Sequence, residues 1–405
     1  MRRAALLVLV ALLAGCGGSD DKRQKLLVVV NAPFSRTPYV GETIDRGVSL
    51  AVKDVNARGG IAIGSTTYEL RVKRLDNGLS PRRALQNVRR AVDDHALAVV
   101  DEGTGVDATW RVAERAGVPI GIVYQGGENL VDAETRPNVF RIAPSNHGLA
   151  FRLAEYLIPK RLKLALLHDD SDYGDAGDAS LRKAFSRNRE SVVADIDVPA
   201  GALDLAPQVL RAKRAGATGL LVWGLPPTIA AAVKAARTSG WDVPVYTPPA
   251  GADPLVRQQL ADHPAWVDGL TFASGRLTAE LGPAPFQAFE QRYEQVYGKE
   301  QVGVRTRDGA KVVQPPEFAM YAYDFVQVLA AAVQTAGSTE PAEVTKALEQ
   351  VSVRGVNGDE RGFNEHNHEG VIDDDVYFAR FHDMTFAPVK DDPLSATLPT
   401  LPQRQ

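Results

Sequence analysis

The segment from Leu26 to Ile61 most limits what this chain can fold into, because it joins a strand pattern to a helix pattern. Five consecutive apolar residues, Leu26 to Val30, form a run rich in β-branched side chains, which is typical of a parallel strand buried on both faces. Apolar residues then recur at spacings of three and four from Ile44 to Val55, as on one face of a helix. Gly59 and Gly60 supply the left-handed backbone that often ends a helix. The segment predicts an opening βα unit with a central strand.

The same alternation continues along the chain and divides into two series. The first series is predicted to contain a strand around Leu70, a helix from Ser80-Pro81, a strand Leu97–Val100, a helix Ala108–Ala116 and a strand Val118–Tyr124. The second runs from Ser145 to Tyr246 in the same way. Two similar halves predict two doubly wound, Rossmann-like α/β lobes. A long helix, Glu317–Ala336, and a hairpin within Gly358–Val389 follow, and the apolar face of that helix, which includes Phe318, is interpreted as core.

In a doubly wound sheet, ligands bind beyond the carboxyl ends of the strands, near the free N–H groups of the following helices. The loop Phe34–Tyr39 after the first strand is therefore expected to face a ligand. Two glycine-containing loops, Gly103–Gly105 and Gln125–Glu128, follow later strands and are expected at the same edge.

The N-terminus carries the most specific short signal in the sequence. Arg2 and Arg3 precede an apolar run, Ala4–Leu13, that is too short to span a bilayer but suits a secretory signal. The residues Leu13-Ala14-Gly15-Cys16 resemble the lipobox of bacterial lipoproteins. This resemblance implies a signal peptide over residues 1–15, lipid attachment at Cys16 and a flexible tether over residues 16–25.

Composition excludes several other classes of protein. Hydrophobic residues make up 44% and charged residues 24% of the 405 residues, as in ordinary soluble globular domains. The net charge of −4 argues against a nucleic-acid partner. The single cysteine excludes a disulfide within the chain.

Several windows in order resemble the type I periplasmic-type solute-binding proteins of ABC importers, in the branched-chain amino-acid binding group. The most telling are Tyr39-Val-Gly41 and the run from Val48 to Ile61, in which Asn56-x-x-Gly59-Gly60-Ile61 ends the helix. The later windows are Ala165–Asp170 followed by Tyr173-Gly174, and the helix Val233–Gly240, which ends in Arg-x-x-Gly. The resemblance covers nearly the whole mature chain.

The resemblance implies two lobes, joined by three crossings near Ala143, Ser274 and Arg354, that close on a small solute. It places residues 26–143 and 275–354 in the first lobe, residues 144–274 and 355–389 in the second, and leaves residues 390–405 as a mobile tail. The implied protein is a monomer outside the cytoplasm, anchored to the cell membrane through Cys16, and it hands its solute to the membrane subunits of an importer. It is not an enzyme, and neither a cofactor nor a metal is implied.

The resemblance also implies which residues contact the solute. These are Tyr39, Thr104, Gly105, Gly126 and Gly127 from the first lobe, and Tyr173, Gly224 and Leu225 from the second. Thr104 and the N–H groups after Gly105 and Gly127 suit a carboxylate or another polar acceptor without any basic side chain. The rings of Tyr173 and Trp223 suit an apolar part of the solute.

One acidic residue of the branched-chain amino-acid binders is missing. In that group an acid follows the strand that corresponds to Val243–Tyr246, whereas here the loop reads Thr247-Pro248-Pro249-Ala250-Gly251, so that Ala250 takes its place at the site. An enclosed ammonium without a partner costs several kcal/mol. The solute is therefore expected to be uncharged or to carry a carboxylate on an aromatic or aliphatic body, unless Asp253, Glu128 or Asp170 replaces the missing acid.

Other interpretations rest on weaker patterns. Gly103-x-Gly105-x-x-Ala108, with Glu128 about 20 residues further on, fits the loose dinucleotide fingerprint but not in the first βα unit. Asp169–Asp175 does not match a calcium loop, because Asp175 occupies the position that needs glycine. Glu365–Glu369 is interpreted as an exposed turn rather than a metal site. A sensor domain without transport remains the alternative to a transport protein, ahead of an enzyme that uses a nucleotide cofactor.

Overall fold

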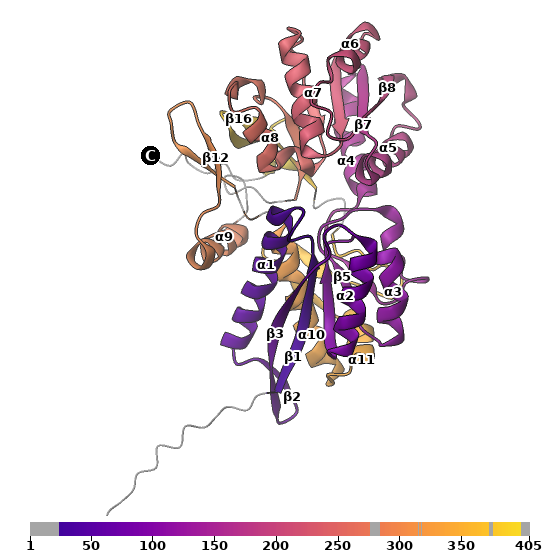
Figure 1. Ribbon diagram of the computed structural model, residues 1–405, viewed down its shortest axis with the longest axis vertical. Helices are drawn as coiled ribbons and strands as arrows, with labels where there is room; N and C mark the ends of the chain where they lie inside the picture. Colours follow the sequence, from indigo (N-terminus) through magenta and orange to yellow (C-terminus); the bar gives the residue numbers. More distant parts are fainter. Residues whose placement is uncertain (1–23, 276–283, 315, 317, 372–375, 398–405) are drawn as a thin grey trace, which may run out of the picture.

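The computed structural model describes residues 24–275, 284–314, 316, 318–371 and 376–397. The predicted signal peptide, Cys16 and most of the predicted tether lie outside these residues. The tether ends before Lys25, because Gln24 and Lys25 already pair with Tyr68 and Glu69 in the first sheet. Two α/β lobes lie one above the other along the long axis of the molecule (Figure 1). None of the described helices is both long enough and apolar enough to cross a membrane.

The first lobe is built on a six-stranded sheet with the order β2-β3-β1-β4-β5-β6. Its strands are β1 (Gln24–Ala32), β2 (Ile61–Ile63), β3 (Thr66–Asp76), β4 (Ala96–Asp101), β5 (Ile120–Ile122) and β6 (Val139–Arg141). All neighbouring pairs except β2 and β3 are parallel. The predicted central strand is confirmed, because β1 lies between β3 and β4 and residues 27–32 are buried. The strand order reverses between β1 and β4, which makes their carboxyl ends the switch point of this sheet.

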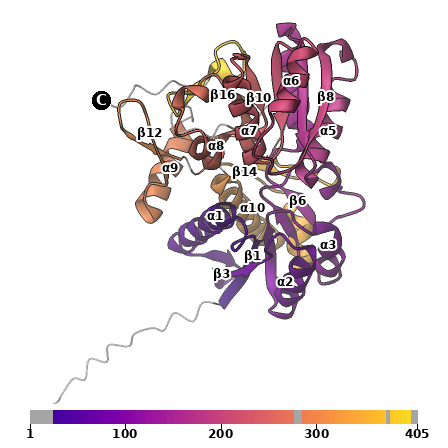
Figure 2. The ribbon, with the colours of Figure 1, turned by 45° about the horizontal axis from the view of Figure 1, so that its top comes forward.

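Helices cover both faces of this sheet. They are α1 (Pro38–Ala57), α2 (Pro81–Asp93), α3 (Val106–Arg115), α9 (Ala284–Tyr297), α10 (Ala319–Ala336) and α11 (Pro341–Leu348), with a short 3-10 turn, η1 (Glu128–Leu130). Apolar residues of α1 and α10, which Figure 2 shows next to each other, share one core, and those of α2 and α3 share the core of the other face. Helix α1 begins at Pro38, earlier than predicted, because proline suits the first helical position. Tyr39 therefore lies in the first turn of α1 and not in a loop.

The second lobe is built on a seven-stranded sheet with the order β17-β16-β11-β10-β9-β7-β8. Its strands are β7 (Leu164–Asp169), β8 (Val192–Val198), β9 (Gly219–Trp223), β10 (Val245–Thr247), β11 (Thr271–Ser274), β16 (Tyr377–His382) and β17 (Thr385–Pro388). Strands β7 to β11 are parallel, and β16 and β17 form the predicted hairpin as an antiparallel addition. The order reverses between β7 and β9, so their carboxyl ends form the second switch point.

The helices of the second lobe also follow the predicted alternation. They are α4 (Asn146–Leu157), α5 (Asp172–Ala184), α6 (Ala206–Arg214), α7 (Pro226–Thr238) and α8 (Pro254–Gln259), with the 3-10 turns η2 (Ile158–Lys160), η3 (Arg189–Ser191), η4 (Pro249–Ala252) and η5 (Pro264–Trp266). Ser145 and Ser171 cap α4 and α5 by accepting hydrogen bonds from Gly148 N and Gly174 N. Ser145 starts α4 just after the first crossing between the lobes, and Ser171 starts α5 just after β7.

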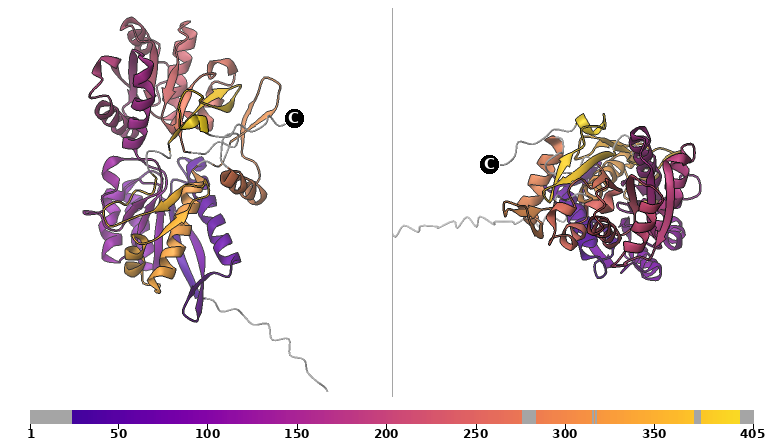
Figure 3. Two further views of the ribbon diagram at one scale, coloured as in Figure 1. Left: turned by 180° about the vertical axis from the view of Figure 1, so that it is seen from behind. Right: turned by 90° about the horizontal axis from the view of Figure 1, so that it is seen from above.

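The late part of the chain returns to the first lobe for longer than predicted. Strands β14 (Ser352–Arg354) and β15 (Glu360–Gly362) pair, and Phe363 and Val371 lie in the core that α1 and α10 share. Seen from behind, this segment and α10 lie in the lobe that the N-terminal strands form (Figure 3). The assignment of residues 355–371 to the second lobe is therefore wrong. Val371 packs in the first lobe and Val376 in the second, so the predicted crossing near Arg354 is also wrong.

A second correction concerns the hairpin β12 (Gln301–Arg305) and β13 (Lys311–Val313), which was assigned to the first lobe with its neighbours. Val302, Val304 and Val312 lie in the core of the second lobe, because the alternating buried face of β12 packs against α8. Helix α9, just before the hairpin, packs in the core of the first lobe. The segment from α9 to β13 therefore contacts both lobes.

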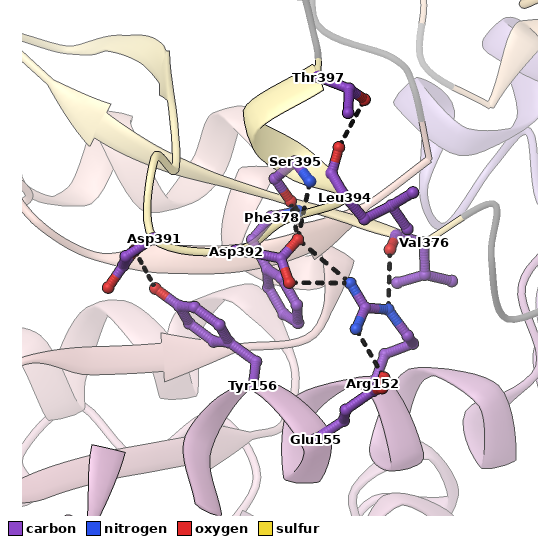
Figure 4. Close-up of polar contacts among 10 residues, drawn as sticks. All are labelled: Arg152, Glu155, Tyr156, Val376, Phe378, Asp391, Asp392, Leu394, Ser395 and Thr397. Atoms are coloured by element: carbon purple, nitrogen blue, oxygen red, sulfur yellow. Dashed lines mark hydrogen bonds and ion pairs between the residues drawn. The ribbon is translucent and has the colours of Figure 1, made fainter. Parts of the chain in front are cut away.

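The C-terminal segment was predicted to be a mobile tail from residue 390, but up to residue 397 it is packed against the second lobe. Asp392 is 4% exposed and accepts hydrogen bonds from Arg152 of α4 at 3.2 Å from each carboxylate oxygen (Figure 4). Ser395 donates to Asp392 and accepts from Phe378 N of β16 at 2.7 Å. Buried charge is retained where it is paired, and this pair links α4, β16 and the turn η7 (Ser395–Thr397). The remaining tail residues, 398–405, lie outside the described part of the chain.

Candidate functional site

The predicted site residues lie at the carboxyl ends of the strands in both sheets. Tyr39, Thr104, Gly105, Gly126 and Gly127 follow β1, β4 and β5 of the first lobe, and Tyr173, Gly224, Leu225 and Ala250 follow β7, β9 and β10 of the second. These edges of the two sheets meet between the lobes, because Ser180 of α5 donates to Glu128 of η1 at 2.8 Å. The topology therefore places both switch points at the contact between the lobes.

A chain of aromatic rings occupies this region. The ring of Phe318 contacts those of Tyr39 and Tyr124 edge to face, with centroids 5.5 Å and 5.0 Å apart. Burial, followed by the negative potentials of Tyr124 and Asp169, raises the pKa of Tyr173 well above its ordinary value. Tyr124 follows β5 in the first lobe and Tyr173 lies in the first turn of α5 in the second, so both belong to the strand-end edges that meet between the lobes. We refer to Tyr39, Phe318, Tyr124 and Tyr173 as the aromatic chain.

Two members of the aromatic chain were not recognised in the sequence. Tyr124 was interpreted as the end of a strand, but β5 ends at Ile122 and the Tyr124 side chain is 40% exposed. Phe318 was interpreted as part of the core face of α10, whereas it is the N-cap residue of that helix and only partly buried. Their positions in the sequence could have indicated a place at the site. Phe318 starts a helix and Tyr124 follows a parallel strand, and both kinds of position lie at the ligand-binding edge.

The loop that carries Thr104 is held by two buried carboxylates. Asp101 accepts hydrogen bonds from Asn31 Nδ2 at 2.6 Å and Gly103 N at 2.7 Å. Glu102 accepts from Asn77 Nδ2 and from Thr104 N, both at 2.9 Å. The Thr104 amide is therefore committed to the protein and does not serve a solute, contrary to a site made only of free amides.

The hydroxyl of Thr104 keeps a hydrogen that it can donate to a solute. Its Oγ1 accepts a hydrogen bond from Gln125 Nε2 at 3.1 Å, and the same Nε2 also reaches Glu102 Oε2 at 3.1 Å. A hydroxyl has one donor and two acceptor positions; Oγ1 accepts from Gln125, and its hydrogen bond to Glu102 helps to lower the pKa of that acid, so the hydroxyl serves a solute by turning its hydrogen away from Glu102. Thr104 can therefore hydrogen-bond a carboxylate or carbonyl between the lobes.

The two buried carboxylates have raised pKa values. Burial, with the charge of Glu102 as the next cause, raises the pKa of Asp101 to about 8, and burial also raises the pKa of Glu102. A carboxyl whose pKa is raised on folding binds more protons in the folded state than in the unfolded state. Its contribution to stability is complete below the unfolded pKa and is lost as the pH rises through the folded pKa.

We therefore expect the free energy of unfolding to fall between about pH 4 and pH 8, by up to about 1.4 kcal/mol per pH unit for this one proton. Asp101→Asn should flatten this part of the profile because it removes the titrating group. Urea titrations at a series of pH values measure the slope, with Asp107→Asn at an exposed acid as the control. An unchanged slope in Asp101→Asn would contradict the assignment.

The loop after β5 is fixed from beneath by an arginine. Arg141 is 1% exposed; its guanidinium donates to Gly127 O at 2.7 Å and forms an ion pair with Glu369 at 2.5 Å. At Gly126 an added Cβ would lie 2.6 Å from Asn146 Oδ1 and 2.7 Å from Pro144 O, at the first crossing between the lobes. Gly126 therefore has a packing role at the crossing, and Gly127 lies in a loop that Arg141 orients.

In the second lobe a fully buried carboxylate connects the loops after β7 and β9. Asp169 Oδ2 accepts from Leu225 N and from Thr228 Oγ1, both at 2.7 Å, and Oδ1 accepts from Ser171. An added Cβ at Gly224 would lie 2.5 Å from Asp169 Oδ2, so the close approach requires glycine. Asp169 thereby positions the N-termini of α5 and α7 at the switch point.

Trp223 does not lie where it could cover a solute. Its side chain is fully buried, and an added Cβ at Gly177 of α5 would lie 2.2 Å from the indole. The last residue of β9 points under α5, because successive strand residues alternate between the two faces of a sheet. Trp223 therefore packs in the core next to Tyr173, with ring centroids 5.9 Å apart.

The three acids that could replace the missing carboxylate are all engaged by the protein. Asp253 caps α8 by accepting from Leu255 N at 2.8 Å, and burial raises its pKa. Asp170 accepts from Ala200 N at 2.6 Å. Glu128 accepts from Ser180 and lies 3.9 Å from Lys183 Nζ. Each of these acids has at least one carboxylate oxygen engaged by the protein, which makes it a weaker partner for an ammonium group.

The segment Glu365–Glu369 is only partly the exposed turn that was predicted. Glu365 and His366 are exposed, but His368 is 1% exposed and its ring lies 2.9 Å from Val139 O and 3.1 Å from Glu349. Glu369 pairs with Arg141. This segment closes one edge of the first lobe, because the peptide groups of Arg141 and Glu369 form a parallel bridge.

Residues 28–392 match the family described as periplasmic binding protein. The amino acid binding protein of Pseudomonas aeruginosa is 25% identical over 328 residues, which cover 78% of this chain and 80% of the relative. Leu/Ile/Val-binding protein homolog 2 of Brucella abortus is 24% identical over 358 residues, which cover 85% of this chain and 86% of the relative.

Solved structures share the fold at lower identity. The branched-chain amino-acid transporter substrate-binding protein of Streptococcus pneumoniae, in complex with isoleucine, superimposes with a TM-score of 0.74 at 22% identity and covers 90% of this chain and 98% of its own. A solute-binding protein of an ABC transporter from R. palustris, in complex with benzoate, gives 0.70 at 19% identity, with 90% and 95% covered. The chain therefore belongs to the periplasmic binding protein family, with the type I fold of the solute-binding proteins of ABC transporters.

Proposed function

We propose that this solute-binding protein takes a small aromatic or aliphatic solute that is uncharged or carries a carboxylate, and delivers it to an ABC importer. The observation that supports this ligand class is the aromatic chain, with Tyr39, Phe318 and Tyr124 in contact at the first switch point and Tyr173 beside the second. Aromatic rings pack favourably edge to face and offer an apolar body with a polar hydroxyl. The benzoate complex of the R. palustris relative is a precedent for such a ligand on this fold.

The polar end of the solute is assigned to the first lobe. The Thr104 hydroxyl, which accepts from Gln125, lies one residue before the N-cap of α3 and would turn its hydrogen from Glu102 to the solute. A helix N-terminus favours an anionic group there. Because Asp253, Asp170 and Glu128 are engaged elsewhere, an ammonium group would lack a counter-charge from any of the three and lose affinity.

Binding is expected to close the two lobes, and small-angle scattering tests this part of the proposal. A solute that touches both lobes favours the closed arrangement by its differential affinity for that arrangement. The radius of gyration of the monomeric mature protein should fall when a ligand identified by thermal shift is added. An unchanged radius at saturation, from a state that is not already closed, would contradict two-lobe capture.

Anchoring at Cys16 is the second part of the proposal, and it is supported by the charged start, the apolar run and the lipobox-like residues Leu13–Cys16. Cys16→Ala should abolish lipid attachment and release the protein from the membrane fraction, because a protein without a lipid chain or spanning helix has no anchor. Detergent phase partition and intact-mass measurement check this. Equal partition of both proteins into the aqueous phase, with no lipid mass on the wild type, would refute anchoring.

A further inference from the structure

A histidine and three aspartates meet in the second lobe, away from the residues between the lobes. His168 on β7 is in register with Asp197 on the edge strand β8, and Asp195 lies two residues earlier on the same face. Asp178 reaches the group from α5. The Nε2 atom of His168 lies 2.9 Å from Asp197 Oδ1, 3.3 Å from Asp195 Oδ1 and 3.6 Å from Asp178 Oδ1.

The histidine ring is buried and is aimed into this group. His168 is 5% exposed, and neither of its ring nitrogens makes a hydrogen bond of acceptable geometry. The Oδ1 atoms of Asp178 and Asp195 are buried and likewise without a hydrogen bond. One Nε2–H could point at only one of the three oxygens, so a protonated ring would leave the other two unsatisfied, at the cost that buried polar atoms carry.

Arg182 binds the other carboxylate oxygen, Oδ2, of Asp178 and of Asp195. Its guanidinium lies 2.7 Å from Asp178 Oδ2 and 2.6 Å from Asp195 Oδ2. Both aspartates are therefore rotated so that their Oδ1 atoms face His168. Three carboxylates against the guanidinium of Arg182 and the nearby charge of Arg211 leave an excess of negative charge beside a neutral ring, which a dication would neutralise.

We propose that His168, Asp178 and Asp195 form a site for a divalent transition-metal ion, with Zn²⁺ as the ion that fits best and with the exposed carboxylate of Asp197, next to the His168 ring, at its entrance. Imidazole and carboxylate are both common zinc ligands. Atoms placed tetrahedrally at about 2.1 Å from zinc lie about 3.4 Å from one another. The three distances from Nε2 bracket this value, and the ligand atoms of His168, Asp178 and Asp195 all lie within 4.8 Å of one another.

The surroundings match what a metal site requires. Arg182 fixes the orientation of two ligands from outside, as hydrogen-bonding partners of metal ligands do. The side chain of Asp197 is 85% exposed, which gives an ion a way in from solvent. A calcium ion is a poorer fit, because it prefers six to eight oxygen ligands and this group offers an imidazole nitrogen.

Zinc titration of the mature protein tests the site. The protein, without a histidine tag and after treatment with a chelator, should bind one Zn²⁺ in calorimetry and rise in melting temperature with added zinc. Arg182→Gln should weaken binding by about tenfold to a hundredfold. His168→Gln and Asp195→Asn should weaken it further, since each removes a ligand. Co²⁺ in place of Zn²⁺ should give the strong visible absorption of a tetrahedral complex.

Two matched variants separate this site from zinc bound elsewhere. His366→Gln removes a histidine whose side chain is 86% exposed, and Asp242→Asn removes an aspartate that is 95% exposed, so neither should change the affinity. Asp197→Asn should fold normally and still bind more weakly. The inference is overturned if no zinc binds, if folded His168→Gln and Asp195→Asn bind as the wild type does, or if only His366→Gln loses binding.

Discussion

Asp392→Ala is expected to lower the free energy of unfolding by about 3 kcal/mol, because it removes the buried partner of Arg152 and leaves that guanidinium only the exposed Glu155 and the carbonyl of Val376. The side chain of Arg152 is 7% exposed and that of Asp392 is 5% exposed. Asp392 also accepts from Ser395 N at 2.8 Å. The variant therefore loses the charge pair and releases the turn that holds the C-terminal segment against β16 (Figure 4).

The neighbouring acid provides a matched control. Asp391 pairs with Lys160 and accepts from Tyr156 at 3.1 Å, but its side chain is 57% exposed. Asp391→Ala should cost about 1 kcal/mol or less, as exposed ion pairs do. The pair Arg152→Met with Asp392→Leu should recover much of the lost stability, because an apolar pair leaves no unpaired buried charge.

Urea unfolding of the soluble protein measures all three variants. If Asp392→Ala falls within about 1 kcal/mol of Asp391→Ala, the charge pair does not anchor the C-terminal segment. If the double variant is as unstable as Asp392→Ala alone, the loss comes from the hydrogen bonds to Ser395 and not from an unpaired Arg152.

The fold was predictable from local patterns because it is built from repeated βα units. The apolar run of β1, the three-and-four spacing of α1 and the serine-proline start of α2 each depend on residues close together in the sequence. Doubly wound topology then follows from alternation and from right-handed crossovers. This is why the two doubly wound sheets and the loops at their strand ends were expected where the structure has them.

The parts that were predicted wrongly depend on distant partners. Asp392 pairs with an arginine 240 positions earlier, so a segment rich in proline, serine and threonine gave no local sign of packing. Strands β12 and β15 are short, and their assignment to a lobe depends on which core receives Val302 or Phe363. Sequence spacing does not contain that information.

The candidate site, too, was only partly predictable from the sequence. Loops after strands could be placed from topology: Thr104 follows β4 and Tyr173 follows β7, whereas Tyr39 follows β1 but lies in the first turn of α1. Whether the side chain of such a residue faces the other lobe or the core depends on the residue at which the strand ends. Trp223 closes β9 and points into the core, whereas Tyr124 comes two residues after β5 and remains exposed.

An aromatic carboxylate, such as benzoate or a hydroxybenzoate, is expected to raise the melting temperature, whereas leucine, isoleucine and valine are not. At a hundredfold excess over its Kd, a ligand adds about 2.7 kcal/mol of stability, which a thermal-shift panel detects easily. The panel should include the deaminated acids of the three amino acids. These acids keep the carboxylate and the apolar body and lack the ammonium, so they isolate the cost of that one group.

Variants in the aromatic chain then test how the ligand is held. Phe318→Ala removes a ring that contacts Tyr39 and Tyr124, and edge-to-face contacts are worth about 0.5–1.5 kcal/mol each beyond the area they bury. A ligand that packs against these rings should bind at least about tenfold more weakly, since about 1.4 kcal/mol is a factor of ten. Phe318→Tyr is the control, because it retains the ring and should keep most of the affinity.

Thr104→Val separates recognition of the carboxylate from packing against the rings. It removes the hydroxyl that Gln125 orients and preserves the shape of the side chain, so carboxylate ligands should weaken while uncharged aromatic amides weaken less. Strong shifts with leucine, isoleucine or valine, together with none from their deaminated acids or from aromatic acids, would overturn the proposed ligand class. In that case an acid outside the described residues, or Asp253 released from its cap, must pair with the ammonium group, because an enclosed unpaired charge would not permit tight binding.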